Sequence, residues 1–404
     1  MPQANGTFGG EGGIRTPGAG RPAQLLSRQP CSTTPAPLHA QQGSCQGSPQ
    51  KTCGIVENLP RRVNVTTTQN RNHTTTFLLS STVAGIMCRS ELGLGNILEA
   101  KKRLEGVVQK TPLVLSKFHP EVYYKAENLQ LTGSFKLRAA FNQLSLLSDA
   151  EKQQGVVTSS SGNFAQAAAY ASKTMGVSCK IVMMRSSNAL KIVRTQQLGG
   201  KVVFCEDRFS ARQEMVSAIQ QDERRVVIHP YDHPQTIAGN GTLALEILKQ
   251  LPEVKNIVVP ISGGGLIGGI ALAVKTHRPQ IKVWGIQPQR ANATQLSWQA
   301  GKRVGIRSAQ TIADGLTATL PGKLTFPIIQ QLVESVEVVK EDSIRQAVAH
   351  CLLEEKLVVE PSGAVPLAAA LEEKVPLCQT VLVLSGGNIT PALMKQILSG
   401  RQGA

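Results

Sequence analysis

The sequence predicts an α/β protein with parallel sheets flanked by helices, and the alternation of two kinds of segment carries this prediction. From about Ile97 onward, short runs rich in β-branched residues alternate with longer segments whose apolar residues recur at helical spacing. Such alternation is typical of βαβ units. The patterned part spans roughly 310 residues, more than one hydrophobic core usually covers, so two domains are expected.

The expected strands are short, apolar and bounded by turn residues. They cover Glu121–Lys125, Gly155–Thr158, Lys180–Met184, Lys201–Cys205, Arg225–Ile228, Asn256–Pro260, Lys282–Ile286, Ser335–Val339 and Thr380–Leu384. The expected helices cover Phe164–Met175, Leu190–Leu198, Ala211–Gln220, Gly241–Gln250, Leu266–Lys275 and Ser343–Leu352. We predict a large domain from residues 93–151 and 233–404, and a small domain from residues 152–232.

Residues 1–92 are rich in Gly, Pro, Ser, Thr, Gln and Asn, and they show neither a helical nor a strand period. We interpret them as an unstructured extension, which is either a targeting segment or an upstream reading frame translated in error. The longest apolar stretch among them, Phe77 to Cys88, is interrupted by hydroxyl residues and is too short to span a bilayer. No membrane association is therefore expected.

The net charge of +16 raises nucleic acid as a partner, so the distribution of the charge matters. Residues 1–90 hold eight Lys and Arg against Glu11 and Glu57, and the surplus beyond them is spread among acidic residues. This pattern is typical of an ordinary basic surface, and no nucleic-acid partner is expected. The eight cysteines form no CxxC pair, which argues against a zinc site and favours a reducing, cytoplasmic location.

A polar turn, Glu127–Phe135, leads into a helical stretch that begins at Lys136. Gly133 permits a tight turn, and Ser134 is placed to cap the N-terminus of the helix. A lone lysine in a first helical turn is usually a solvated surface residue. Lys136 therefore indicates a functional site only in combination with the other motifs.

Hydroxyl side chains gather in a second motif, Thr158–Asn163, between an expected strand and an expected helix. Backbone N–H groups and hydroxyls at a helix N-terminus bind anions, such as the carboxylate of an amino acid. An ordinary capping loop has the same composition. The candidate substrate-binding residues are Ser160, Ser161, Gly162 and Asn163.

Glycines dominate a third motif, Ser262–Gly269, which follows an apolar strand and opens a helix. Consecutive glycines let backbone N–H groups approach a phosphate closely, and the helix dipole favours negative charge there. The motif lacks both the ending of a Walker A loop and the spacing of a dinucleotide fingerprint. A fourth motif, Ser385–Asn388, places a hydroxyl at the carboxyl end of a strand, where α/β sheets bind ligands.

In order and spacing, these motifs resemble the serine/threonine dehydratase and serine racemase family of fold type II pyridoxal-phosphate enzymes, which share the fold of the tryptophan synthase β subunit. The resemblance runs from about Ile97 to Gly400. It rests on Lys110–Leu113, TGSFKLRAA, SSSGNFAQAAAY, Ile237–Thr242, SGGGLIGGI, Thr311–Gly315, Val359–Ala364 and LSGGN.

The resemblance implies pyridoxal 5'-phosphate as the cofactor, with Lys136 as its Schiff-base lysine and then as the base that takes the α-proton. It also implies that Asn163 and Ser385 contact the pyridine ring and that the glycine loop binds the phosphate. The residues assigned to the cofactor are Phe135, Lys136, Asn163, Gly263, Gly264, Gly265, Leu266 and Ser385. A neutral hydroxyl at Ser385 cannot hold a protonated pyridine nitrogen by charge, which favours loss of a β-hydroxyl.

The predicted function is therefore a lyase that converts L-serine or L-threonine into a 2-oxo acid and ammonia. Serine racemase is the alternative within the family, because Ser161 stands where racemases carry an acid/base serine and dehydratases usually have alanine. A β-elimination on a hydroxy-aspartate is a third candidate. Gln287 and Ala293 replace the carboxylates of the divalent-cation site found in family racemases, so no metal is expected. Phe164 and Ser262 also depart from the family pattern.

A rival of another class is a non-catalytic amino acid or nucleotide sensor on the same fold, and retention of Lys136 argues against it. A nucleic-acid binder would need a clustered basic and aromatic stretch, which the chain does not contain. We expect an enzyme of amino acid metabolism that acts on a small amino acid as a homodimer. No regulatory domain is expected.

Overall fold

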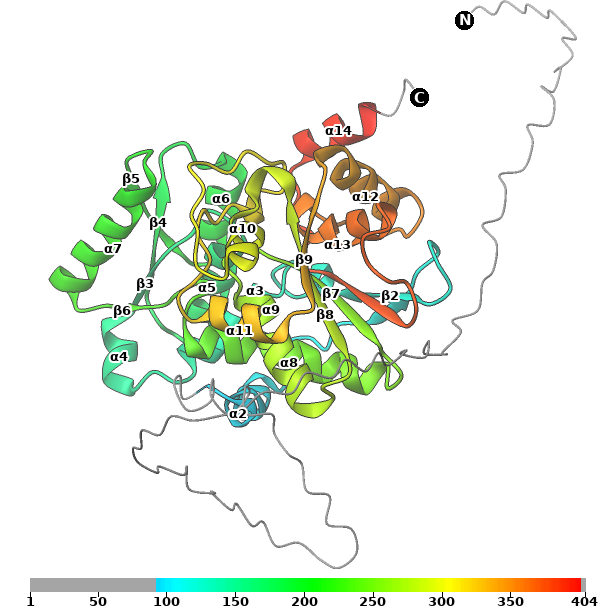
Figure 1. Ribbon diagram of the computed structural model, residues 1–404. Helices are drawn as coiled ribbons and strands as arrows, with labels where there is room; N and C mark the ends of the chain where they lie inside the picture. The colour runs from blue at the N-terminus through cyan, green and yellow to red at the C-terminus, as the bar shows by residue number, and fades with distance from the viewer. Residues whose placement is uncertain (1–91, 401–404) are drawn as a thin grey trace, which may run out of the picture. The chain divides into compact units, whose positions relative to one another are not determined.

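The computed structural model describes residues 92–400, so the predictions for residues 1–91 lie outside the described part of the chain. Two sheets organise this part (Figure 1). One has six strands in the order β1-β2-β10-β7-β8-β9, and the other has four in the order β5-β4-β3-β6. All strand pairs are parallel except β1–β2. The prediction of parallel sheets flanked by helices is confirmed.

The elements follow one another in a β/α alternation. The strands are β1 (Leu113–Leu115), β2 (Val122–Ala126), β3 (Val156–Ser159), β4 (Cys179–Met184), β5 (Lys201–Cys205), β6 (Val226–Val227), β7 (Asn256–Pro260), β8 (Lys282–Pro288), β9 (Ser335–Val339) and β10 (Thr380–Leu384). The helices are α2 (Leu94–Leu104), α3 (Lys136–Leu144), α4 (Asp149–Gln154), α5 (Asn163–Thr174), α6 (Ala189–Gln197), α7 (Phe209–Glu223), α8 (Pro234–Gln250), α9 (Gly265–His277), α10 (Ala293–Ala300), α11 (Thr325–Leu332), α12 (Glu341–Leu353), α13 (Pro361–Leu371) and α14 (Pro391–Ser399). The 3₁₀ turns are η1 (Glu127–Leu129), η2 (Gln289–Ala291) and η3 (Asp314–Leu316).

Four strands, β5, β7, β9 and β10, begin and end where the sequence pattern predicts, and the other expected strands differ by at most two residues. The pattern misses β1, which is three residues long and pairs antiparallel at the edge of the sheet. Helix α8 begins at Pro234, seven residues before its predicted start. Proline suits the first helical position, and the Nδ1 atom of His233 accepts a hydrogen bond from the N–H of Gln235.

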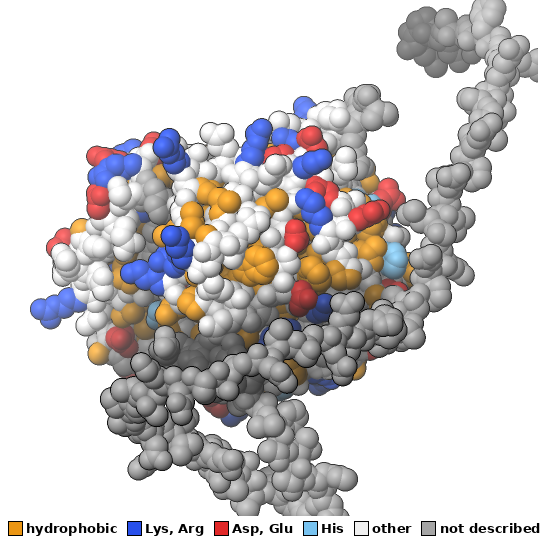
Figure 2. Space-filling view, viewed as in Figure 1, with side chains coloured by type: hydrophobic (Ala, Val, Ile, Leu, Met, Phe, Trp, Pro, Cys, Tyr) orange, Lys and Arg blue, Asp and Glu red, His pale blue; other side chains and the backbone are white. Residues whose placement is uncertain are grey.

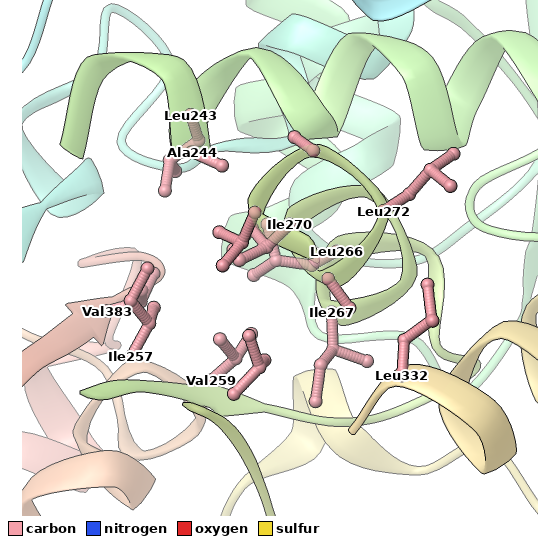
Figure 3. Packing of buried hydrophobic residues seen from close by; sticks show 14 of the residues in the cluster. Leu243, Ala244, Ile257, Val259, Leu266, Ile267, Ile270, Leu272, Leu332 and Val383 are labelled. Carbon is pink, nitrogen blue, oxygen red and sulfur yellow. The ribbon is translucent and has the colours of Figure 1, made fainter. Parts of the chain in front are cut away.

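Helices cover both faces of the six-stranded sheet, as a buried parallel sheet requires. Helices α2, α8, α9 and α11 pack on one face, and α12, α13 and α14 pack on the other. Figure 3 shows α9 between β7 and α8, with Ile270 among the packed side chains. A Cβ on Gly269 would stand 2.3 Å from the carbonyl oxygen of Ile237, so this glycine lets α8 and α9 lie close together. Leu92, which was expected to precede the fold, is 1% exposed in the same core.

The four-stranded sheet is covered by α3 and α5 on one face and by α7 on the other. Its strands and helices all come from residues 152–232, apart from α3. The division into a large and a small domain stays a prediction. The carboxyl ends of β3, β7 and β10 each lead into one of the motifs singled out from the sequence.

A buried network of charged side chains fixes the start of α3. Arg138, which is 1% exposed, donates hydrogen bonds to Glu127 of η1 and to Glu246 of α8. The amine of Lys125 on β2 donates to the same Glu246 carboxylate at 2.6 Å. Such charges are tolerated inside a protein because each is paired and hydrogen-bonded. The network therefore locks α3 to the sheet two residues after Lys136.

The described surface carries charges of both signs. Figure 2 shows Lys and Arg side chains lying among acidic and uncharged ones on the viewed face. No helix within residues 92–400 is both long and apolar enough to cross a membrane.

Candidate active site

Helix α3 begins at Lys136, as predicted, but Ser134 does not cap it. Phe135 occupies the cap position and the helix has no side-chain cap bond, so the prediction for Ser134 is wrong. Gly133, with φ of +71°, turns the chain toward the end of β10 instead. There Ser134 pairs with Gly386, and the N–H of Phe135 donates to the carbonyl oxygen of Ser385 at 3.1 Å. Backbone bonds to the β10 end thus replace the cap and bring two motifs together.

The Lys136 residue is half-buried, and its amine lies close to an aromatic ring and a carbonyl group. Its Nζ donates a hydrogen bond to the carbonyl oxygen of Pro230 at 3.0 Å and lies 5.0 Å from the ring centroid of Phe135. Burial lowers the pKa of Lys136 to about 8, while the carboxylate of Glu360 acts in the opposite direction. An amine of this kind is available in its neutral form near physiological pH.

A loop that the sequence reasoning missed, residues 229–232, joins Lys136 to the glycine motif. His229 accepts hydrogen bonds from the backbone N–H groups of Tyr231 and Asp232, which closes the loop into a tight turn. Burial lowers the pKa of His229 to about 4, so its ring is neutral and can accept. A Cβ on Gly263 would lie 2.2 Å from the Tyr231 ring. The tyrosine therefore packs directly on the glycine loop.

The glycine motif forms the N-terminus of α9. Gly264 has φ of +95°, and a Cβ there would crowd Thr325 and Ile329 at 2.7 Å. The carbonyl oxygen of Gly263 accepts from the Thr325 hydroxyl at 2.6 Å, which fixes the loop from behind. The unusual Ser262 has a local function, because its hydroxyl accepts a hydrogen bond from the N–H of Ala318 at 3.2 Å.

The hydroxyl motif forms the N-terminus of α5, with Gly162 at the cap. Ser160 accepts a hydrogen bond from the N–H of Gly162 at 3.4 Å. A Cβ on Gly162 would meet nothing within 4 Å, so no neighbouring group packs against this residue on that side. Phe164 turns away from it and is buried in the core of the four-stranded sheet.

Ser161 lies beside a cationic side chain that the sequence did not single out. Its Oγ is 2.8 Å from the hydroxyl of Ser187 and accepts a hydrogen bond from Nη2 of Arg212 at 3.2 Å. Burial lowers the pKa of Arg212, although the guanidinium keeps its charge. No local pattern could have indicated this contact, since Arg212 lies on α7, fifty-one residues after Ser161.

Asn163 is held by hydrogen bonds to residues that flank the six-stranded sheet. Its Nδ2 donates to a carboxylate oxygen of Glu360, and its Oδ1 accepts from Nδ2 of Asn388 at 2.8 Å. Ser385, the other predicted ring contact, lies at the end of β10 and is 4% exposed. Glu360 and Asn388 belong to segments that carried the family resemblance, but no local pattern assigned them a role.

The positions of the family's cation site are filled by neutral groups. Gln287 is fully buried, its Oε1 accepts from the N–H of Gln295 at 2.8 Å, and its Nε2 donates to the carbonyl oxygen of Ile261 at 3.4 Å. Ala293 begins α10 and is also buried. Within residues 92–400, no group of three or more His, Cys, Asp and Glu side chains is arranged to bind a metal ion.

These residues fit pyridoxal phosphate. The amine of Lys136, the amide of Asn163 and the hydroxyl of Ser385 come from segments joined by the hydrogen bonds described above. The first turn of α9 offers free backbone N–H groups, in a loop where side chains at 263 and 264 would clash with their neighbours. A phosphate needs such close access to the backbone. Leu266, the last predicted contact, is 5% exposed in the first turn of α9.

Comparison with known proteins gives the same assignment. The family model described as "Pyridoxal-phosphate dependent enzyme" matches residues 104–386. The catabolic L-threonine dehydratase of Escherichia coli (strain K12) is 40% identical over 315 residues, covering 76% of this chain and 96% of that protein. A serine racemase of Oryza sativa subsp. indica is 37% identical over 318 residues, covering 76% and 94%.

Solved structures are similar over the same part of the chain. The structure of maize serine racemase superposes with a TM-score of 0.73 at 37% identity, and the match covers 76% of this chain and 97% of that one. A chain with relatives named for two different reactions needs its own site to decide between them.

Proposed function

Because the chain belongs to the family of pyridoxal-phosphate-dependent enzymes, we propose that it is an ammonia-lyase that acts on L-serine and L-threonine, with serine racemization as the alternative reaction. The observation that carries the proposal is the half-buried amine of Lys136. This amine donates to the carbonyl oxygen of Pro230, in the loop whose Tyr231 packs on the glycine motif of α9, and burial lowers its pKa to about 8.

In this proposal Lys136 Nζ holds the cofactor covalently, and the first turn of α9 holds its phosphate. When bound, pyridoxal phosphate withdraws electrons from the substrate Cα and so makes its proton acidic. Once released from the cofactor, the amine of Lys136 would be the general base that takes the α-proton. The hydroxyl motif at α5 binds the substrate carboxylate through backbone N–H groups and Ser160. Loss of the β-hydroxyl as water and subsequent hydrolysis give a 2-oxo acid and ammonia.

Ser385 supports elimination as the main reaction, because a neutral hydroxyl cannot stabilise a protonated pyridine nitrogen by charge. Ser161 supports the alternative. A racemase needs an acid on the face opposite Lys136, and Arg212 beside the Ser161 hydroxyl would stabilise its ionised form. The similar proteins include both a threonine dehydratase and a serine racemase, which is consistent with elimination as the main reaction and racemization as the alternative.

The test is product analysis on one purified sample supplied with L-serine, L-threonine and D-serine. We expect pyruvate and 2-oxobutyrate with equal ammonia, faster than interconversion of the serine enantiomers. Lys136→Ala should abolish both reactions, whereas Lys101→Ala, on the exposed side of α2, should abolish neither. Racemization faster than pyruvate formation would overturn the preference for the lyase.

We further propose a homodimer and a cytoplasmic location. Three exposed apolar residues, Leu129, Leu131 and Val358, support the homodimer, with exposures of 46%, 47% and 48%. They lie on neighbouring segments, since Nδ2 of Asn128 in η1 donates to the carbonyl oxygen of Val358 at 3.1 Å. The free cysteines among the described residues, three of them buried, support a reducing compartment.

A further inference from the structure

Glu360 is a buried carboxylate beside the candidate active site, and backbone contacts hold it in place. It is 3% exposed and stands at the N-cap of α13, yet its side chain makes no capping bond. Its N–H donates to the carbonyl oxygen of Gly386 at 3.0 Å. A Cβ on Gly386 would lie 2.5 Å from Oε1 of Glu360. The glycine after Ser385 therefore makes room for this carboxylate.

A chain of hydrogen bonds determines which end of the Asn163 amide faces Glu360. The carbonyl oxygen of Thr132 can only accept, so the atom of Asn388 that lies 2.9 Å from it must be its Nδ2 donor. The same Nδ2 donates to Asn163, which identifies the Asn163 atom as Oδ1. The Nδ2 of Asn163 then donates one N–H to Glu360 and keeps the other for a ligand.

Three charged groups from three further elements act on Glu360. Asp314 of η3 forms an ion pair with Lys191 of α6, and Lys136 lies on α3. Burial and, after it, the charge of Asp314 raise the pKa of Glu360, while Lys191, the hydrogen bond from Asn163, and Lys136 lower it, and the net effect is a pKa of about 7. The carboxyl therefore changes charge near neutral pH.

Glu360 also has a route for proton exchange. A pocket of about 160 Å³ lies between α6, η3 and the start of α13, and Lys191, Asp314 and Glu360 are among its lining residues. This volume is large enough for several water molecules, each of which takes about 30 Å³ in the liquid. The carboxyl can therefore titrate without opening of the fold.

We propose that Glu360 is a positioning residue that controls Asn163 through its own charge. The ionised carboxylate holds the Asn163 amide by a charge-assisted hydrogen bond, and the protonated acid holds it more weakly. The contact of Asn163 with the cofactor ring then depends on the protonation of a residue that does not touch the substrate. This inference rests on the cofactor, and it holds whichever of the two reactions the enzyme performs.

The test is a pH titration of the absorption spectrum of the full-length holoenzyme without substrate. Between about pH 5.5 and 8.5 the wild-type ratio of visible to near-ultraviolet cofactor absorbance should change with a midpoint near 7. Glu360→Gln should abolish this transition. The control, Glu355→Gln, removes a buried carboxylate bonded to Tyr124 and should keep it. A transition that persists in Glu360→Gln, or that is absent in the wild type, overturns the proposal.

Two further variants give shifts of opposite sign that a merely structural role would not produce. Asp314→Asn should move the midpoint to lower pH, and Lys191→Gln should move it to higher pH. Asp314 has a side-chain exposure of 56%, so its variant is expected to fold even if Glu360→Gln does not. Shifts in the same direction, or no shift, contradict the proposal. An enzyme that shows these shifts but no turnover of serine or threonine would count against the proposed function alone.

Thermal stability gives a readout that does not depend on the cofactor spectrum. Because the folded-state pKa of Glu360 is raised, its stabilising contribution is present below its ordinary pKa of 4.5 and is lost as pH rises through about 7. Glu360→Gln should therefore raise the melting temperature relative to the wild type more at about pH 8 than at about pH 5. An equal change at both pH values would contradict a titrating Glu360.

Discussion

At the scale of single residues, Ser161 separates the two reactions that the relatives perform. Its hydroxyl is held by Ser187 and Arg212, which is a suitable setting for an acid/base group. Ser161→Ala should abolish formation and turnover of D-serine while leaving elimination from L-serine largely in place, because elimination needs only the lysine face. Chiral analysis of the serine pool and a pyruvate assay measure both rates.

The matched control is Ser187→Ala, which removes the neighbouring hydroxyl but leaves Ser161 and Arg212. It should retain measurable D-serine turnover. If Ser161→Ala instead raises the KM for L-serine and L-threonine alike, and the parent enzyme forms no D-serine, then Ser161 is a carboxylate-binding residue rather than a second base.

Lys136 predicts a pH dependence of the chemical step. The neutral amine is the base, and burial lowers its pKa to about 8 from an ordinary 10.5. The kcat for L-serine should therefore rise with pH and level off above about 8, rather than rise until pH 10. Single-turnover kinetics across this range provide the measurement. A rate that falls from pH 6 to 8 would exclude Lys136 as the base in this form.

At the scale of elements, the start of α9 should depend on the absence of side chains. Gly264→Ala places a Cβ at φ of +95° and within 2.7 Å of Thr325 and Ile329. Gly106→Ala is the control, since Gly106 has φ of +76° and open space around it. Each variant should lose roughly 1–2 kcal/mol to the strained backbone. Only Gly264→Ala should also weaken cofactor binding, which equilibrium dialysis against pyridoxal phosphate measures.

The buried network that joins β2, η1, α3 and α8 should be costly to break. Arg138→Met leaves Glu127 buried without its partner, and about 3–5 kcal/mol of unfolding free energy should be lost. Denaturant unfolding of the holoenzyme measures it. Lys102→Ala removes an exposed ion pair with Glu99 on α2 and should have no measurable effect. Equal effects of the two variants would show that the network does not stabilise the fold.

At the scale of the whole molecule, the proposed homodimer can be tested through one exposed leucine. Leu131→Lys places a charge among the apolar residues at Leu129 and Val358, so it should convert the dimer into monomers. Leu146→Lys is the control, because Leu146 is 46% exposed elsewhere on the surface. Light scattering coupled to size-exclusion chromatography gives the mass of each variant. If the Leu131→Lys protein is still a dimer, the proposed location of the interface is wrong.

The sequence by itself determined the α/β class, the positions of nine strands to within two residues, the four motifs and Lys136. Local sequence patterns predict these features, because a buried parallel strand must be continuously apolar and a phosphate-binding loop must be free of side chains. Four strands consequently begin and end where the pattern predicts. The sequence failed where neighbours along the chain do not decide the conformation, as at Ser134, whose cap was replaced by pairing with Gly386.

Only the tertiary structure decided which distant side chains meet at the site. Arg212 donates a hydrogen bond to Ser161, which lies fifty-one residues earlier in the chain. Lys136 donates to the carbonyl oxygen of Pro230, ninety-four residues later, and Asn163 donates to Glu360, one hundred and ninety-seven residues later. Such contacts follow no period, because a single hydrogen bond constrains two residues and leaves the chain between them unconstrained. The same holds for the pKa of Glu360, which is set by burial and by groups on four other elements, η3, α6, α5 and α3.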